Sequence, residues 1–189
     1  MRTGSVIYAS YPYTLMRCFI AIPYNPGPVI RDIMKTVNEK YGKNAKMAKP
    51  EDMHITIEFF DDISEDMAAD IWNGLNTKAF INSTVSIMGI SHFPEGRKAR
   101  ILVMPVDGNK ILDRNQELYQ KGRHRWNGRN FRPHLTICRF RSPVYVSDLE
   151  KMYEYADIPL APVQEIVFIK SVLSSEGPIY SIFRKTQLI

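Results

Sequence analysis

The hydrophobic positions of the chain fall into short apolar runs and longer amphipathic stretches. Runs typical of strands begin at Met16 and near residue 134, and others lie at about 53–60, 79–90 and 99–106. The runs at 53–60 and near 134 each contain a His-x-Thr sequence. A stretch that follows several prolines has helical spacing instead. Its apolar stripe comprises Ile30, Ile33, Met34, Val37 and Tyr41.

Further helices are expected later in the chain. The second begins after Ser64, a residue type that caps helix N-termini well. A third is expected near 109–122, and a short fourth helix near Ser147, which has the Ser-x-x-Glu spacing of a capping box with Glu150. The inward face of the second helix is expected to comprise Met67, Ile71, Trp72 and Leu75.

The order of these elements indicates the fold class. The chain ends in two apolar runs separated by Ser-Ser-Glu-Gly-Pro, which predicts a hairpin. Strands and helices alternate irregularly, which favours an α+β fold with antiparallel sheets over a parallel doubly wound sheet. Each half also contains a helix, a His-x-Thr strand and another helix, so a weak internal symmetry is expected.

Length and composition are those of a globular protein. With 189 residues and 44% apolar content, the chain can form one domain, expected over 16–189. No run approaches the roughly 18 apolar residues of a membrane span. Residues 1–15 lack the features of a secretory signal and are interpreted as an N-terminal extension or a misassigned start, so a cytoplasmic location is expected.

The cysteines point to packing rather than to metal binding. Only Cys18 and Cys138 occur, each in a predicted strand, and the chain has no C-x-x-C or H-E-x-x-H spacing. We expect two reduced thiols and no structural metal.

The charge distribution suggests a polyanionic partner. The net charge is +5, and between Lys121 and Arg141 basic residues occur without any Asp or Glu. The loop before the second His-x-Thr strand interleaves Arg side chains with Trp126 and Phe131, as single-stranded RNA binding would require. The alternative is a solvated loop whose Trp126 packs on the domain.

Two of the four histidines occur in the same local pattern. His54 and Thr56 stand two residues apart in an apolar run, as do His134 and Thr136. Residues two apart in a strand share a face, so each imidazole is expected beside a hydroxyl and above an apolar face. One such motif alone is best explained as a half-buried histidine, but the pair favours a shared site. His92 is interpreted as structural.

Two imidazoles and two hydroxyls in one cleft suit a phosphodiester. A neutral histidine can take a proton from water, and a protonated one can give a proton to the leaving oxygen. The threonine hydroxyls can donate to the non-bridging oxygens, and nearby arginines offset their charge. Geometry alone does not assign which histidine has which role.

These residues also carry a family resemblance. The segments KPEDMHITIEFFDD, HFPEGRKARILVMPV, FRPHLTICRF and SVLSSEGPIYSIF resemble the two-histidine (2H) phosphoesterases and their HxTx motifs, in particular the RNA 2',3'-cyclic phosphodiesterases, historically called 2'-5' RNA ligases. The resemblance runs from Met16 to about Leu188. It implies a bilobal α+β fold, with two antiparallel sheets, flanking helices and pseudo-twofold symmetry around a central cleft.

The resemblance also implies roles for individual residues. His54 matches the family's proton donor, His134 its proton acceptor, and Thr56 and Thr136 its phosphate-binding hydroxyls. Arg139 matches a basic position of the family, but by strand parity it faces the cleft only if the strand has ended, bulged or twisted. Arg132 and Trp126 are further candidates for binding the substrate.

The resemblance implies hydrolysis of RNA 2',3'-cyclic phosphate ends to 2'-phosphates without a metal or other cofactor, and reversible 2'-5' ligation is a possible companion activity. We expect a monomer whose partner is RNA or an oligonucleotide with such an end. The alternative is a non-catalytic module that binds a nucleotide or RNA end in the same cleft. Both histidines and both threonines are present, which favours the enzyme, since a binder needs no titrating group.

Overall fold

The computed structural model describes residues 15–75, 77–107, 132–175 and 177–188. The third expected helix, near 109–122, lies outside these ranges. The described helices are α1 (Pro28–Tyr41), α2 (Glu65–Asn73) and α4 (Ser147–Met152), with short 3-10 turns at Gly42–Asn44, Pro50–Asp52 and Thr77–Phe80. The strands are β1 (Met16–Pro23), β2 (Ala45–Met47), β3 (His54–Ile63), β4 (Thr84–Ile87), β5 (Ser91–Phe93), β6 (Ala99–Asp107), β7 (His134–Val144), β8 (Ala161–Pro162), β9 (Glu165–Ser174) and β10 (Gly177–Gln187).

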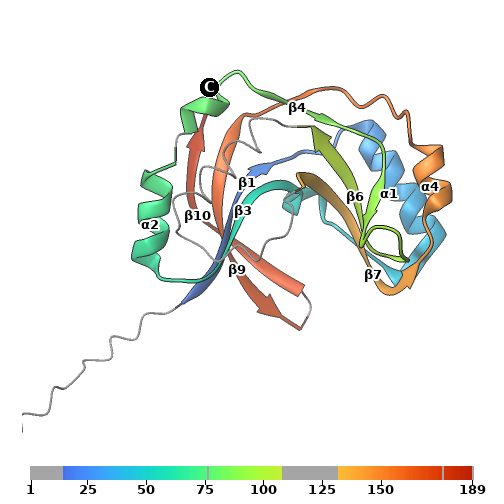
Figure 1. Cartoon of the computed structure of the whole chain (residues 1–189), viewed down its shortest axis with the longest axis horizontal. Coiled ribbons are helices and arrows are strands. Elements are labelled where there is room, and N and C mark those ends of the chain that lie inside the picture. Colours follow the sequence, from blue (N-terminus) through green and yellow to red (C-terminus); the bar gives the residue numbers. More distant parts are fainter. Residues whose placement is uncertain (1–14, 76, 108–131, 176, 189) are drawn as a thin grey trace, which may run out of the picture.

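The ten strands form one antiparallel sheet. Its order is β10-β9-β1-β3-β7-β6-β4-β8, with β2 paired to β7 and β5 to β6. Figure 1 shows the sheet bent into an arch, with the three labelled helices on its outer side. The α+β class and the antiparallel pairing are confirmed. The expectation of two separate sheets is corrected, because β3 and β7 join the two halves through the pair Ile55 and Leu135.

The helices form where their apolar stripes predict them. Ile30, Ile33, Met34 and Val37 of α1 are buried, as expected. In α2 the Ser64 side chain accepts a hydrogen bond from the Met67 backbone N–H, which confirms the cap. Ile71 and Leu75 are buried and Trp72 packs against the core, as predicted, whereas Met67 is exposed and Ala68 is buried in its place.

Two other predictions are wrong in detail. The strand expected over 79–90 is shorter: β4 begins at Thr84, and a 3-10 turn at Thr77–Phe80 precedes it. The capping box of α4 does not form, since Val146 is the N-cap and makes no side-chain hydrogen bond there. Glu150 instead contacts His92, a residue far away in sequence.

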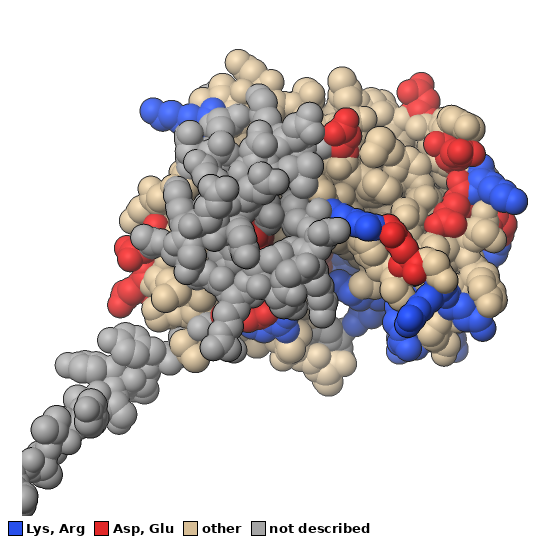
Figure 2. All heavy atoms as spheres, in the orientation of Figure 1, with Lys and Arg blue, Asp and Glu red and all other residues tan. Residues whose placement is uncertain are grey.

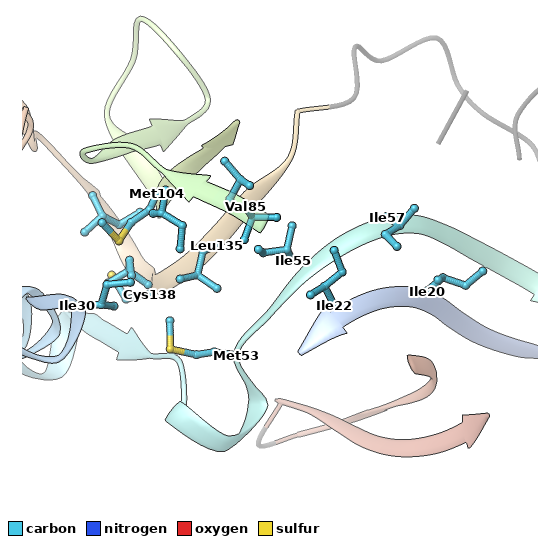
Figure 3. Packing of buried hydrophobic residues seen from close by; sticks show 14 of the residues in the cluster. Ile20, Ile22, Ile30, Met53, Ile55, Ile57, Val85, Met104, Leu135 and Cys138 are labelled. Carbon is cyan, nitrogen blue, oxygen red and sulfur yellow. The ribbon is translucent and has the colours of Figure 1, made fainter. Parts of the chain in front are cut away.

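The main core lies between the sheet and the helices on the outer side of the arch. Ile20 and Ile22 of β1, Ile55 of β3 and Leu135 of β7 are all nearly or fully buried there. Figure 3 shows Ile55 and Leu135 side by side where the two halves meet. Burial of this pair fixes which residues of β3 and β7 face the opposite, inner side of the arch, because neighbours along a strand point to opposite faces.

Candidate active site

The two His-x-Thr sequences meet on the inner face of the sheet. Ile55 pairs with Leu135 and both point into the core, so the flanking residues of each strand point inward to the arch. An antiparallel pair has local twofold symmetry, which brings His54 toward Thr136 and Thr56 toward His134. The neighbouring strands match as well, since Pro23 lies opposite His54 and Pro105 lies opposite His134.

Both imidazoles are held in the same tautomer. Nδ1 of His54 lies 2.7 Å from the carbonyl oxygen of Asp52, and Nδ1 of His134 lies 2.8 Å from that of Arg132. A carbonyl oxygen can only accept, so each Nδ1 carries the proton and donates it. Each neutral ring therefore keeps Nε2 as an acceptor, and neither Nε2 has a hydrogen-bond partner among the described residues.

Aromatic rings fix the orientation of the two imidazoles. The His54 ring stacks on Phe19 of β1, with ring centroids 4.7 Å apart and planes at 29°. Tyr180 of β10 meets it edge-on at 5.7 Å. His134 meets the ring of Phe93 edge-on at 5.1 Å. The sequence reasoning did not identify these three aromatic residues, and the signal available for Phe19 was its position on a predicted strand.

A β-bulge decides where Arg139 points. Val103 of β6 lies opposite Thr136, but the preceding residue of β6, Leu102, lies opposite Cys138, so Ile137 is the extra residue of β7. The bulge reverses the alternation of β7, and beyond it Cys138 is buried while Arg139 is exposed. Arg139 thus shares the inner face with His134 and Thr136, as the parity argument required of a bulged strand.

The other half contains the matching bulge. Ala21 of β1 lies opposite Thr56 and Ile20 lies opposite Glu58, which leaves Ile57 as the extra residue of β3. Beyond it Phe59 is exposed on the inner face, and its ring centroid lies 5.3 Å from that of Phe19. The two halves therefore present different side chains at equivalent positions: an aromatic ring beside His54 and a guanidinium beside His134.

The surroundings favour the neutral form of both histidines. Burial lowers the pKa of His54, and the charges of His134 and Arg139 lower it further, while Asp52 acts in the opposite direction. Burial is also the main cause that lowers the pKa of His134, again with a contribution from Arg139. These mutual effects place His54, His134 and Arg139 in one electrostatic environment.

The remaining candidates lie elsewhere or outside the described residues. The Arg132 side chain forms an ion pair with Glu95. Trp126 lies outside the described ranges, so its predicted contact with substrate stays a prediction.

Cys18 and Cys138 are free and buried. The described residues contain no cluster of three or more His, Cys, Asp or Glu side chains able to hold a metal ion. Within the same ranges, no helix is long and apolar enough to span a membrane.

Comparison with known proteins identifies the family. Residues 20–103 match the model of the LigT like Phosphoesterase family. The RNA 2',3'-cyclic phosphodiesterase of Aquifex aeolicus (strain VF5) is 30% identical over 153 residues, which cover 76% of this chain and 81% of that protein. The protein of the same name from Archaeoglobus fulgidus is 27% identical over 89% of this chain and 98% of its own length.

Solved structures share the fold. TT0787 of Thermus thermophilus superposes with a TM-score of 0.69 at 20% identity, over 92% of this chain and 98% of that one. E. coli LigT complexed with 3'-AMP gives a TM-score of 0.61 at 15% identity, over 92% and 98% of the two chains. The paired His-x-Thr strands on one antiparallel sheet are those of a two-histidine phosphoesterase. The chain belongs to the LigT-like phosphoesterase family.

Proposed function

We propose that this protein hydrolyses RNA 2',3'-cyclic phosphodiester ends to 2'-phosphomonoesters. The observation that carries the proposal is the convergence of His54, Thr56, His134 and Thr136 on the inner face of the sheet, with Arg139 turned to the same face by the bulge. A cyclic phosphate is an anion that needs donors around its oxygens and one proton donor and one acceptor on opposite sides of phosphorus. The names of the relatives support this substrate class.

The proposed reaction is an in-line displacement. Nε2 of His134 takes a proton from a water molecule, whose oxygen forms a bond to phosphorus. The bond from phosphorus to the 3'-oxygen breaks, and the protonated His54 gives its Nε2 proton to that oxygen. Thr56, Thr136 and Arg139 donate to the non-bridging oxygens, where negative charge accumulates. An RNA 5'-hydroxyl in place of water would give a 2'-5' linkage by the same transfers.

A direct assay tests the proposal. The protein is incubated in EDTA with a short RNA that ends in a 2',3'-cyclic phosphate, and ³¹P NMR distinguishes cyclic phosphate from 2'- and 3'-monophosphate. We expect complete conversion to the 2'-phosphate without added metal. Binding without turnover between pH 5 and pH 8 would identify the protein as a non-catalytic module. A 3'-phosphate product would reverse the assignment of the leaving oxygen.

The pH dependence follows from the pKa shifts of the two histidines. The reaction needs a protonated His54 and a neutral His134. Burial lowers the pKa of both below the ordinary value of about 6.5. The fraction of free enzyme in the active protonation state therefore peaks below pH 6.5, and it falls as the pH rises through the pKa of His54. We expect the maximum of kcat/KM on the acid side of pH 6.5, and a maximum above pH 7 would contradict this reading.

A further inference from the structure

The turn between β5 and β6 reaches His134 by two separate routes. Phe93, at the end of β5, meets the His134 ring edge-on, with an interplanar angle of 75°. Glu95, in the turn itself, forms an ion pair with Arg132. The carbonyl oxygen of Arg132 accepts the hydrogen bond from Nδ1 of His134. One short segment thus contacts the imidazole ring directly and also the residue that fixes its tautomer.

The same turn is anchored to a helix in a different part of the fold. His92 lies next to Phe93, and because strand neighbours point to opposite faces, its side chain is directed to the other side of the sheet. There Nδ1 of His92 lies 2.7 Å from Oε1 of Glu150 in α4, and Nε2 lies 2.9 Å from the carbonyl oxygen of Arg97. The anchor therefore ties β5 to α4 and to the far end of its own turn.

The anchor lies in a partly buried position. The Glu150 carboxylate can only accept, so Nδ1 of His92 donates the hydrogen bond between them. The side chains are 16% and 31% exposed for His92 and Glu150, which limits solvent screening of the pair. The interaction is thus a charge-assisted hydrogen bond in a partly buried position.

The two imidazoles of the active site differ in how they are supported. His54 rests on Phe19 of the central strand β1, and Tyr180 of the long strand β10 covers its edge. The described aromatic support of His134 comes from β5, a strand of three residues followed by a turn. A short strand at the side of a sheet has few ladder hydrogen bonds, so side-chain contacts must fix its position.

We propose that His92 and Glu150 anchor the β5–β6 turn so that Phe93 and Glu95 hold the His134 imidazole in its reactive orientation. These four are positioning residues, since none of them contacts the reacting atoms in the proposed reaction. The assignment of His134 as the proton acceptor rests on the proposed function, but the support of its ring can be measured without turnover.

Loss of this support affects the rate more than substrate binding. A general base must keep its acceptor nitrogen within hydrogen-bond reach of the attacking water, and misplacement by about 1 Å can cost roughly 100-fold in rate. Among the described residues, no hydrogen bond, ion pair or ring contact joins the turn to Thr56, Thr136 or Arg139, the proposed phosphate ligands. We therefore expect kcat to fall while KM stays nearly constant.

Three variants and one control test the inference. Glu95→Gln removes the ion pair, Phe93→Leu removes the aromatic edge, and Glu150→Gln removes the charge at the anchor, each with little change in volume. The control is Lys98→Gln, which changes a charge in the same turn, where Lys98 lies over the Tyr145 ring. With a 2',3'-cyclic mononucleotide, we expect each test variant to lose about 10-fold to 100-fold in kcat, with KM within about twofold. Lys98→Gln should match the wild type.

The pH profile separates positioning from a general loss of stability. The charged groups around His134 are His54 and Arg139 on the inner face and Arg132 with its partner Glu95. Glu95→Gln leaves the Arg132 charge uncompensated, which should lower the pKa of His134 and move the acidic limb of kcat/KM to lower pH. Glu95→Asp keeps the charge and should restore most of the wild-type profile.

Imidazole NMR of the substrate-free protein gives an independent readout. In the wild type, ¹⁵N–¹H spectra should show one Nδ1–H tautomer for His134, and the test variants should show both tautomers in exchange. Folded variants with wild-type kcat, pH profile and His134 signals would overturn the inference. If the wild type shows no turnover, the proposed function fails, while the tautomer signals still decide whether the turn holds the ring. If one of the three test variants fails to fold, the remaining folded variants decide: exchanging His134 tautomers support the inference, and wild-type His134 signals overturn it.

Discussion

Replacing His134 or His54 with alanine is expected to lower kcat by about 100-fold to 10,000-fold, the usual contribution of one general acid or base. Each variant loses one of the two proton transfers, but Arg139 and the threonines still bind the phosphate, so substrate affinity should change far less. The measurement is single-turnover hydrolysis of a 2',3'-cyclic nucleotide, together with substrate binding by titration calorimetry.

The double variant provides the internal control for this prediction. If the two histidines act as a unit, His54→Ala with His134→Ala should be only slightly slower than either single variant, because the second proton transfer is of little use without the first. Losses that multiply fully, or a single variant that keeps more than about a tenth of the rate, would argue that the histidines do not share one reaction.

Arg139→Gln is expected to lower kcat/KM by about 100-fold, in the range found for loss of one donor that stabilises transition-state charge. The same change removes a positive charge that lowers the pKa of both His54 and His134. Both pKa values should therefore rise, and the maximum of kcat/KM should move toward higher pH. The measurement is a pH series for the wild type and the variant with one substrate.

Arg141→Gln is the matched control for this experiment. Arg141 lies two residues further along β7 and is also exposed, and its Nε donates to the Lys43 carbonyl oxygen at 2.9 Å. The substitution removes the same charge on the same strand, further from the histidines. We expect kcat/KM within about twofold of the wild type and an unchanged pH profile. Equal losses in both variants would mean that general electrostatics, and not Arg139 itself, assists the reaction. Figure 2 shows Lys and Arg side chains gathered at the lower right of the molecule, where Figure 1 draws β7.

The sequence predicted the parts of the structure that depend on local periodicity. The stripe of α1 and the Ser64 cap follow from residues close together in the chain, and both are confirmed. The meeting of the two His-x-Thr strands could be inferred because one motif occurs twice in a chain with four histidines. The alternation of side chains along a strand then correctly placed Ile55 and Leu135 on the face of the sheet that does not carry the imidazoles.

Features that arise from packing between distant segments could not be predicted in this way. A bulge inserts a residue without a sequence signal, so the direction of Arg139 stayed conditional until the register of β6 and β7 was known. Glu150 satisfies the capping-box spacing, yet its carboxylate bonds to His92 because tertiary contacts compete with local ones. Phe19 and Phe93 contact the histidines only through strand pairing, which no local pattern encodes.

The bulge in β7 also determines the reactivity of the Cys138 thiol. It turns Cys138 into the core, where burial raises its pKa to about 12, and burial together with Asp61 raises the pKa of Cys18 to about 12. At pH 8 only roughly one thiol in 10,000 is then the reactive thiolate. An alkylating reagent will label these cysteines through transient separation of the strands. The labelling rate of each cysteine therefore reports the free energy of local opening in its own half of the arch, and no cysteine has to be introduced.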